Sequence, residues 1–228
     1  MEEIKLYILI FFIYAIAGWI METTMISIRN KKFVNRGFLI GPVCPIYGYG
    51  VVLVSCLLKK YQDDMIITFF MSIIICGLLE YFTSYFMEKI FKARWWDYSS
   101  KKFNINGRIC LDNLILFGFA SCFIVYIVNP FLINKINMIP SNIQTIIICI
   151  LLAIHLIDNI ISYKIILNLK QVSNEIKDNT IEISEKVRNI IHNKSIFHRR
   201  LVNAFPNIKE RVQFTKWTIK EKIDKLKL

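Results

Sequence analysis

The chain has 228 residues, of which 55% are hydrophobic, with a mean hydropathy of +0.45 and a formal net charge of +12. This composition is too apolar for an ordinary soluble domain, and it argues against a soluble nucleic-acid binder in spite of the positive charge. The six cysteines lie in or beside apolar segments and include no C-x-x-C pair, which favours apolar packing over a metal site or disulfide. We therefore expect no metal, no other cofactor and no nucleic-acid partner.

Four apolar segments, at 6–28, 65–88, 111–133 and 143–169, are long enough to cross a bilayer as helices, which takes roughly 20 residues. Residues 38–58 form a fifth apolar segment, which glycines and prolines interrupt. The pattern predicts an all-α integral membrane protein with about five transmembrane helices, of which the second is broken.

The interrupted segment begins within the sequence NRGFLIGPVCPIYGYG at residues 35–50. A helix from Pro45 to Leu58 would rise about 21 Å, which is short of the roughly 30 Å apolar core of a bilayer. We therefore expect residues 37–44 to lie at membrane depth in non-helical form, covered by protein. Such breaks line cavities or sites in membrane proteins, and the candidate site residues here are Asn35, Arg36, Gly37, Gly41, Pro42, Pro45 and Tyr47.

The basic residues of the connections predict the orientation. Connections 29–36 and 89–110 carry four and six Lys or Arg residues, whereas 59–64 has two, offset by two aspartates, and 134–142 has one. Because cytoplasmic connections are enriched in Lys and Arg, this pattern places 29–36, 89–110 and the C-terminal tail in the cytoplasm and the N-terminus outside.

The chain divides into a transmembrane domain at 1–169 and a basic helical tail at 170–228. The tail contains 14 Lys or Arg residues and 7 Asp or Glu residues, and its apolar residues predict two amphipathic helices, at 172–194 and 208–226. A basic amphipathic helix can lie on a membrane surface or dock onto a partner. A solvated extension that packs on itself is an equally good interpretation.

Polar side chains inside the predicted helices are costly, so each needs a reason. On the first, third and fourth of the five predicted spans these are Glu22, Glu80, Ser84, Glu88 and Asp112. Arginines of the adjoining connections are Arg36, Arg94 and Arg108. Glu22, Glu88 and Asp112 fall at the depth of these arginines, which predicts a polar, ion-paired cluster at the cytoplasmic mouth of the bundle. Glu80 lies nearer mid-span, where a functional role is favoured. The cluster is either a site or gate for a polar ligand, or a set of helix-to-helix contacts that only fixes the bundle.

Two further features have alternative interpretations. The sequence RWWDYS places Trp95 and Trp96 beside Asp97, which suits either the headgroup level of a membrane or a re-entrant or docking element. His155 and Asp158 share one face of the last long helix, where they could relay a proton.

Several motifs occur in a fixed order along residues 10–130. They are Tyr14-Ala15 followed by Gly18-Trp19 and Glu22, then NRGFLIGPVCPIYGYG, LEYFTSYFMEKIF, RWWDYS, NGRICLDN and Phe117-Gly118. This ordered set resembles the bacterial ABC-transporter permeases of type IV, also called CmpB-like. Asn113 departs from the Ser or Ala that is typical there, and the tail lies outside the resemblance. The resemblance implies a multi-pass protein of the bacterial cell membrane that works with a separate ATPase.

We therefore expect a permease subunit that moves an unknown substrate, with a path among the first four spans and a coupling surface from 29–44 and 89–110. Its expected partners are membrane lipid, an ATPase subunit and a second copy of the chain. The sequence contains no G-x-x-x-x-G-K-[ST] motif and so no P-loop, and it predicts no catalytic residues. The alternatives are an intramembrane enzyme acting on a lipid or lipid-linked substrate, and a membrane scaffold or sensor that uses the basic tail.

Overall fold

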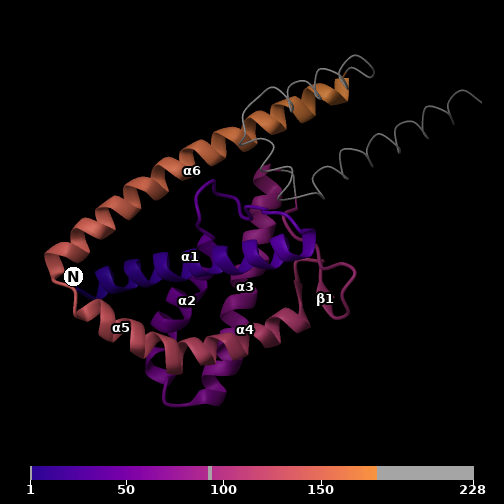
Figure 1. Cartoon of the computed structure of the whole chain (residues 1–228). Coiled ribbons are helices and arrows are strands. Elements are labelled where there is room, and N and C mark those ends of the chain that lie inside the picture. Colours follow the sequence, from indigo (N-terminus) through magenta and orange to yellow (C-terminus); the bar gives the residue numbers. More distant parts are fainter. Residues whose placement is uncertain (1, 92–93, 179–228) are drawn as a thin grey trace, which may run out of the picture.

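A computed structural model describes residues 2–91 and 94–178. The chain forms a bundle of helices with a small hairpin at one end (Figure 1). The helices are α1 (Glu2–Asn30), α2 (Pro45–Leu57), η1 (Lys59–Tyr61), α3 (Met65–Phe91), α4 (Leu111–Phe123), η2 (Ile124–Val128), α5 (Asn129–Asn137) and α6 (Ser141–Asp178), and the strands are β1 (Asn104–Ile105) and β2 (Ile109–Cys110).

Four helical stretches are long and apolar enough to cross a membrane: Glu2–Asn30, Met65–Ile90, Leu111–Asn137 and Ser141–Lys164. Their outer faces expose large apolar side chains, for example Phe70, Ile74 and Leu78 along α3, which suits a hydrocarbon solvent. Helix α2 is apolar but has only 13 residues, so it rises about 20 Å. The prediction of an α-helical membrane protein with a short, broken second helix is confirmed. The two-residue strands are a small addition, and the Asn106-Gly107 pair between them is a typical turn sequence.

Helix α2 packs closely on α1 because glycines remove side chains at the contact. A Cβ at Gly48 would lie 2.4 Å from the carbonyl oxygen of Phe11, and one at Gly18 would lie 2.3 Å from the Tyr47 ring. Pro45 starts α2 at its first turn, where the missing N–H costs nothing. The two helices therefore approach to backbone contact.

The loop before α2 lies against the middle of α1. Residues 37–44 contain no helix, and the N–H of Cys44 donates to the carbonyl of Ala15 at 2.9 Å. The N–H groups of Ile40 and Gly41 donate to the Asp158 carboxylate of α6, each at 2.9 Å. The predicted non-helical stretch is thus present, and several of its backbone N–H groups donate to protein acceptors, as burial away from water favours.

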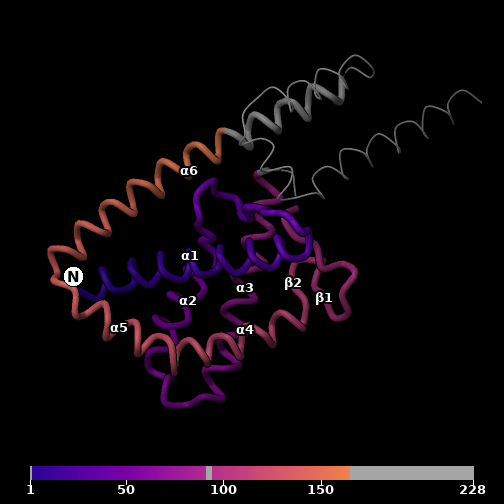
Figure 2. The backbone as a smooth tube through the Cα atoms, in the orientation of Figure 1, coloured from indigo at the N-terminus to yellow at the C-terminus, as the bar shows by residue number. Residues whose placement is uncertain are grey.

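Helices α4 and α5 form one long bent arm through the π-helical turn η2, as the tube in Figure 2 shows. Just past this turn Pro130 removes a backbone donor, which favours a bend. Beside it, the buried Asn129 side chain accepts from the Tyr14 hydroxyl at 2.8 Å and donates to Ser55 Oγ at 2.9 Å. This network ties the bend to α1 and α2.

At the end of the bundle opposite the hairpin, surface contacts join the start of α1 to α6 and η1. Lys5 donates to Ser141 Oγ at 2.7 Å and pairs with Glu2, while Lys59 pairs with Glu3. Helix α6 then leads away from α4 and α5 on the other side of α1 (Figure 1). It continues to Asp178, past the expected domain boundary at 169, which stays a prediction. The expected second tail helix and most of the first lie outside the described residues.

Candidate functional site

The polar candidates gather at the end of the bundle that carries β1 and β2, which we call the hairpin end. There the loop 94–110 folds back on the last turns of α3. Its turn places Asn106 and Gly107 at φ of 53° and 64°, a region that Gly and Asn tolerate. The N–H of Gly107 donates to Asn104 Oδ1 at 2.9 Å, and the N–H of Tyr98 donates to the Gly107 carbonyl at 2.8 Å.

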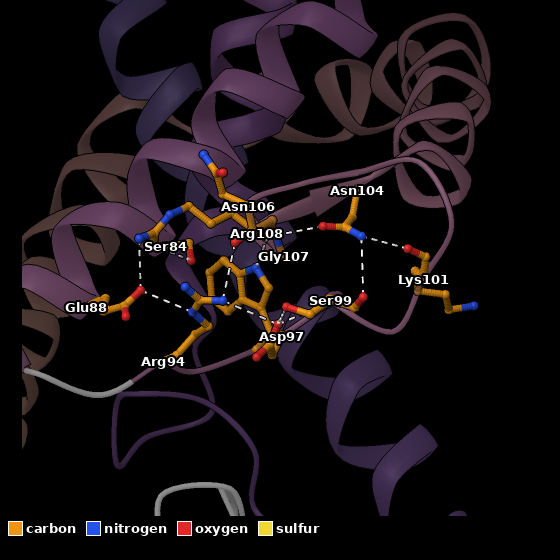
Figure 3. Close-up of polar contacts among 11 residues, drawn as sticks. Ser84, Glu88, Arg94, Asp97, Ser99, Lys101, Asn104, Asn106, Gly107 and Arg108 are labelled. Carbon is orange, nitrogen blue, oxygen red and sulfur yellow. Dashed lines mark hydrogen bonds and ion pairs between the residues drawn. The ribbon is translucent and has the colours of Figure 1, made fainter. Parts of the chain in front are cut away.

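Glu88 of α3 binds two arginines of this loop (Figure 3). Its Oε2 lies 3.1 Å from Arg94 Nε and 2.9 Å from an Arg108 terminal nitrogen. The three side chains are only 24%, 16% and 12% exposed, so water screens their charges weakly. One carboxylate therefore fastens two widely separated loop positions to the end of α3.

Arg108 also joins this cluster to the aromatic face of α3. Its Nη1 donates to Ser84 Oγ at 3.2 Å, and its guanidinium lies 5.8 Å and 5.4 Å from the ring centres of Tyr81 and Tyr85. These distances are within the range of cation–π attraction. An open hollow of about 270 Å³ lies here, lined by Tyr85, Glu88, Lys89 and Arg108.

Asp97 organises the loop from within. Its Oδ1 accepts the N–H and the hydroxyl of Ser99 and lies 3.3 Å from Arg94 Nη1. Burial alone would raise the pKa of Asp97, but the Ser99 hydrogen bonds and the Arg94 charge outweigh it and hold that pKa below its usual value. A Cβ at Gly107 would lie 2.5 Å from Asp97 Oδ1, so a larger residue there would displace this carboxylate.

The two tryptophans hold the loop in place. The indole N–H of Trp96 donates to the Arg108 carbonyl at 3.0 Å. Trp95 is buried and packs edge-on against Phe38, with ring centres 5.8 Å apart. The loops 31–44 and 94–110 are therefore in direct contact through aromatic packing.

A second polar group surrounds Glu22 of α1. Its carboxylate accepts from the Tyr47 hydroxyl at 2.6 Å and lies 3.5 Å from Arg36 Nε. The N–H of Arg36 donates to Thr23 Oγ1 at 3.2 Å. Close by, the Trp19 indole donates to Asn35 Oδ1 at 2.7 Å. This group fixes the start of the loop 31–44 on the last turns of α1.

Glu80 lies deeper in the bundle, about two helical turns before Glu88 on α3. Its side chain is buried, and its Oε1 accepts from the Tyr98 hydroxyl at 3.1 Å. Burial, together with the hydrogen bond to Glu80, raises the pKa of Tyr98 well above its ordinary value. The phenol of this loop residue therefore keeps its proton and acts as a donor.

The structure thus divides the predicted cluster. Arg94, Arg108, Ser84 and Glu88 form one group, and Glu22, Arg36 and Tyr47 form another. The aromatic and backbone contacts of Asn35, Trp95 and Trp96 join loops to helices. Asp112 joins neither group: it is exposed and lies 3.5 Å from Lys101 Nζ.

The glycines and prolines of the broken segment have structural places. Gly37 has a φ of 115°, which side chains rarely adopt, and Gly41 leaves space for the Asp158 carboxylate, whose Oδ2 would lie 2.8 Å from a Cβ. Pro42 is exposed in the loop, and Pro45 begins α2. A proton relay between Asp158 and His155 was one interpretation of the sequence and stays untested; the Asp158 carboxylate accepts hydrogen bonds from the loop and from Ser162.

Tyr98 and Asp158 are the residues that the sequence did not connect to the site. The acidic side chain of Asp158 in an apolar helix was a signal, but its partners are backbone N–H groups more than 100 positions away. Within residues 2–91 and 94–178, no three His, Cys, Asp or Glu side chains converge as a metal site would require.

The comparison with known families decides the relationship. The model of the family described as "Putative ABC-transporter type IV" matches residues 9–163, which include all the polar groups described above. The chain belongs to this family. No curated protein and no solved structure matches the chain. The resemblance inferred from the ordered motifs is thus confirmed for this family, and the match continues beyond the motifs into α6, as far as Tyr163.

Proposed function

We propose that this protein is a permease subunit of the bacterial cell membrane, which moves a substrate together with a separate ATPase. Membership of the Putative ABC-transporter type IV family over 155 of 228 residues is the observation that carries the proposal. Four helices suited to cross a membrane support a membrane component of such a transporter. The absence of a P-loop motif from the 228 residues agrees with an ATPase on another chain.

We further propose that the hairpin end faces the cytoplasm and binds that ATPase. The basic connections 29–36 and 89–110 both lie at this end, and the positive-inside rule supports the orientation. Phe33 and Phe103 are 75% and 79% exposed there, beside lysines. Exposed aromatics in a basic setting suit a protein interface, where aromatic side chains supply much of the binding energy.

The contacts that hold the two loops of the hairpin end on the helices support this role. The ion pairs of Glu88 hold the loop 94–110 on α3, and Trp95 packs it against Phe38 of the loop 31–44. A force applied to either loop is therefore passed to helices that run into the membrane. Tight coupling of a surface to the helices is what an ATP-driven permease requires.

The test is co-purification from the native bacterium. A tagged chain is extracted in detergent, and bound proteins are identified by mass spectrometry. We expect a protein with a P-loop that hydrolyses ATP, and we expect Phe103→Asp to reduce its recovery severalfold. Tyr61→Asp is the matched control, because Tyr61 is also an exposed aromatic residue but lies at the opposite end. Recovery of no P-loop protein, or equal loss in both variants, would contradict the proposal.

An intramembrane enzyme is the second candidate, and the hollow beside Arg108 and Lys89 favours it. Two cations in an open hollow at the end of a membrane helix could bind a lipid phosphate. Turnover of a lipid by the purified chain without any ATPase would support the enzyme and overturn the permease.

A further inference from the structure

Glu80 is a buried acid without a positive partner among the described residues. Its side chain is 6% exposed, and Oε2 has no hydrogen-bond partner there. The nearby arginines are engaged elsewhere: Arg94 and Arg108 pair with Glu88, and Arg36 pairs with Glu22. An ionised carboxylate in this position would be a buried charge without compensation, which costs several kcal/mol.

The groups around Glu80 come from every element packed near it. Glu22 of α1 is within electrostatic range of the Glu80 carboxyl, and Glu22 itself forms an ion pair with Arg36. Tyr98 of the loop 94–110 donates to Oε1. Asn113 of α4 approaches the carboxyl, and Cys76 lies one turn earlier on α3.

Tyr47 of α2 completes the surroundings. It donates to Glu22 at 2.6 Å and lies within electrostatic range of Tyr98. The titratable neighbours of Glu80 are thus Glu22, Tyr98 and Cys76, and Arg36 and Tyr47 lie one contact further away, on Glu22. Because Arg36 already pairs with Glu22, and Arg94 and Arg108 pair with Glu88, the Glu80 carboxyl needs another source of positive charge.

A bound proton supplies the positive charge for the Glu80 carboxyl better than a metal ion does. Hard metal cations take about six or more oxygen ligands, whereas within the described part of the chain no group of acidic, histidine and cysteine side chains converges here as a metal site. A protonated carboxyl needs one acceptor for its new hydroxyl and keeps Oε1 as the acceptor for Tyr98. The side-chain amide of Asn113, which approaches the carboxyl, carries both a donor and an acceptor and can turn its oxygen toward that hydroxyl.

We propose that Glu80 is a proton-binding site inside the membrane bundle, and that Tyr98 controls its release. Tyr98 belongs to the loop 94–110, and its backbone is held by the Gly107 carbonyl at 2.8 Å. Movement of this loop removes the hydroxyl from Oε1 and changes the surroundings of the acid. The surface at the hairpin end and a buried proton are thereby linked. This inference does not depend on the ATPase.

Carbodiimide labelling tests the site directly. Dicyclohexylcarbodiimide enters membranes and reacts with protonated carboxyls, so the full chain in lipid nanodiscs is treated and its peptides are analysed by mass spectrometry. We expect labelling of Glu80 at neutral pH and loss of at least about tenfold as the pH rises through the alkaline range, as for a single titrating group. Glu3, which is exposed and paired with Lys59, is the internal control and stays unlabelled.

Two variants and one exchange of ions complete the design. Glu80→Gln abolishes the label on this peptide. Tyr98→Phe extends labelling to higher pH, because the lost hydroxyl had stabilised the ionised carboxylate. Absence of label on wild-type Glu80 between about pH 5 and pH 9 would overturn the proposal. So would suppression of the label when sodium chloride replaces choline chloride at constant pH, which would assign the site to a metal cation. Both readouts are made without ATP, so they stand apart from the permease test.

Discussion

Replacing Glu88 with glutamine tests whether the hairpin end is held by its partly buried ion pairs. The change keeps the size of the side chain but removes the charge shared by Arg94 and Arg108. Breaking a buried pair by removing one partner costs about 3–5 kcal/mol, and exposed pairs contribute about 0–1 kcal/mol. With side chains that are 12–24% exposed, we expect a loss of about 3 kcal/mol. For a chain of this size, that loss lowers the melting temperature by roughly 6–12 °C.

The assay is thermal melting of a fluorescent fusion of the protein in detergent. The fraction that stays folded after heating is measured by size-exclusion chromatography. Glu3→Gln is the matched control, because Glu3 makes an ion pair with Lys59 in which both side chains are more than half exposed. We expect its melting temperature to stay within roughly 2 °C of the wild type. Equal shifts in the two variants would refute the reasoning, since burial would then not decide the strength of these pairs.

Three further changes probe the rest of the bundle. Gly48→Ala places a Cβ against the backbone of α1 and lowers the melting temperature, whereas Gly50→Ala, whose Cβ has ordinary contacts, leaves it unchanged or slightly higher. In a chain with a single cysteine at position 44, Asp158→Leu removes the acceptor that holds the loop 37–44 and so speeds maleimide labelling of the buried Cys44 thiol severalfold. An unchanged labelling rate would show that Asp158 does not hold the loop in place. Asp97→Asn lowers the melting temperature at neutral pH. This difference shrinks as the pH falls below 3.8, because the stability from a depressed carboxyl pKa is lost on protonation.

The sequence predicted the helices well because their signal is local. Length and hydropathy locate α1, α3, α4–α5 and α6, and the distance that Pro45–Leu58 can span predicts the non-helical loop before α2. The strands β1 and β2 were missed because two-residue strands have no periodic pattern, and only the Asn-Gly turn marks them. These short strands depend on Asn104, whose side chain caps the turn.

The site was predicted in composition but not in pairing. Acids and arginines at one end of the bundle could be counted, but which arginine pairs with Glu88 depends on how the loop folds over α3. Asp112 and Glu88 lie at similar expected depths, yet the first faces outward toward Lys101 and the second is enclosed. Helix rotation and loop folding are tertiary properties, and periodicity alone does not determine them.

Hydrogen bonds attach the loop 37–44 to two different helices. One attachment is the hydrogen bond from Cys44 to Ala15 in the middle of α1, and the other is the pair of bonds from Ile40 and Gly41 to Asp158 on α6. Between them the chain is too short to absorb a large displacement, since a residue extends at most about 3.6 Å. A tilt of α6 therefore pulls on the first turn of α2. The hydrogen bonds to Asp158 thus couple the position of α6 to that of α2.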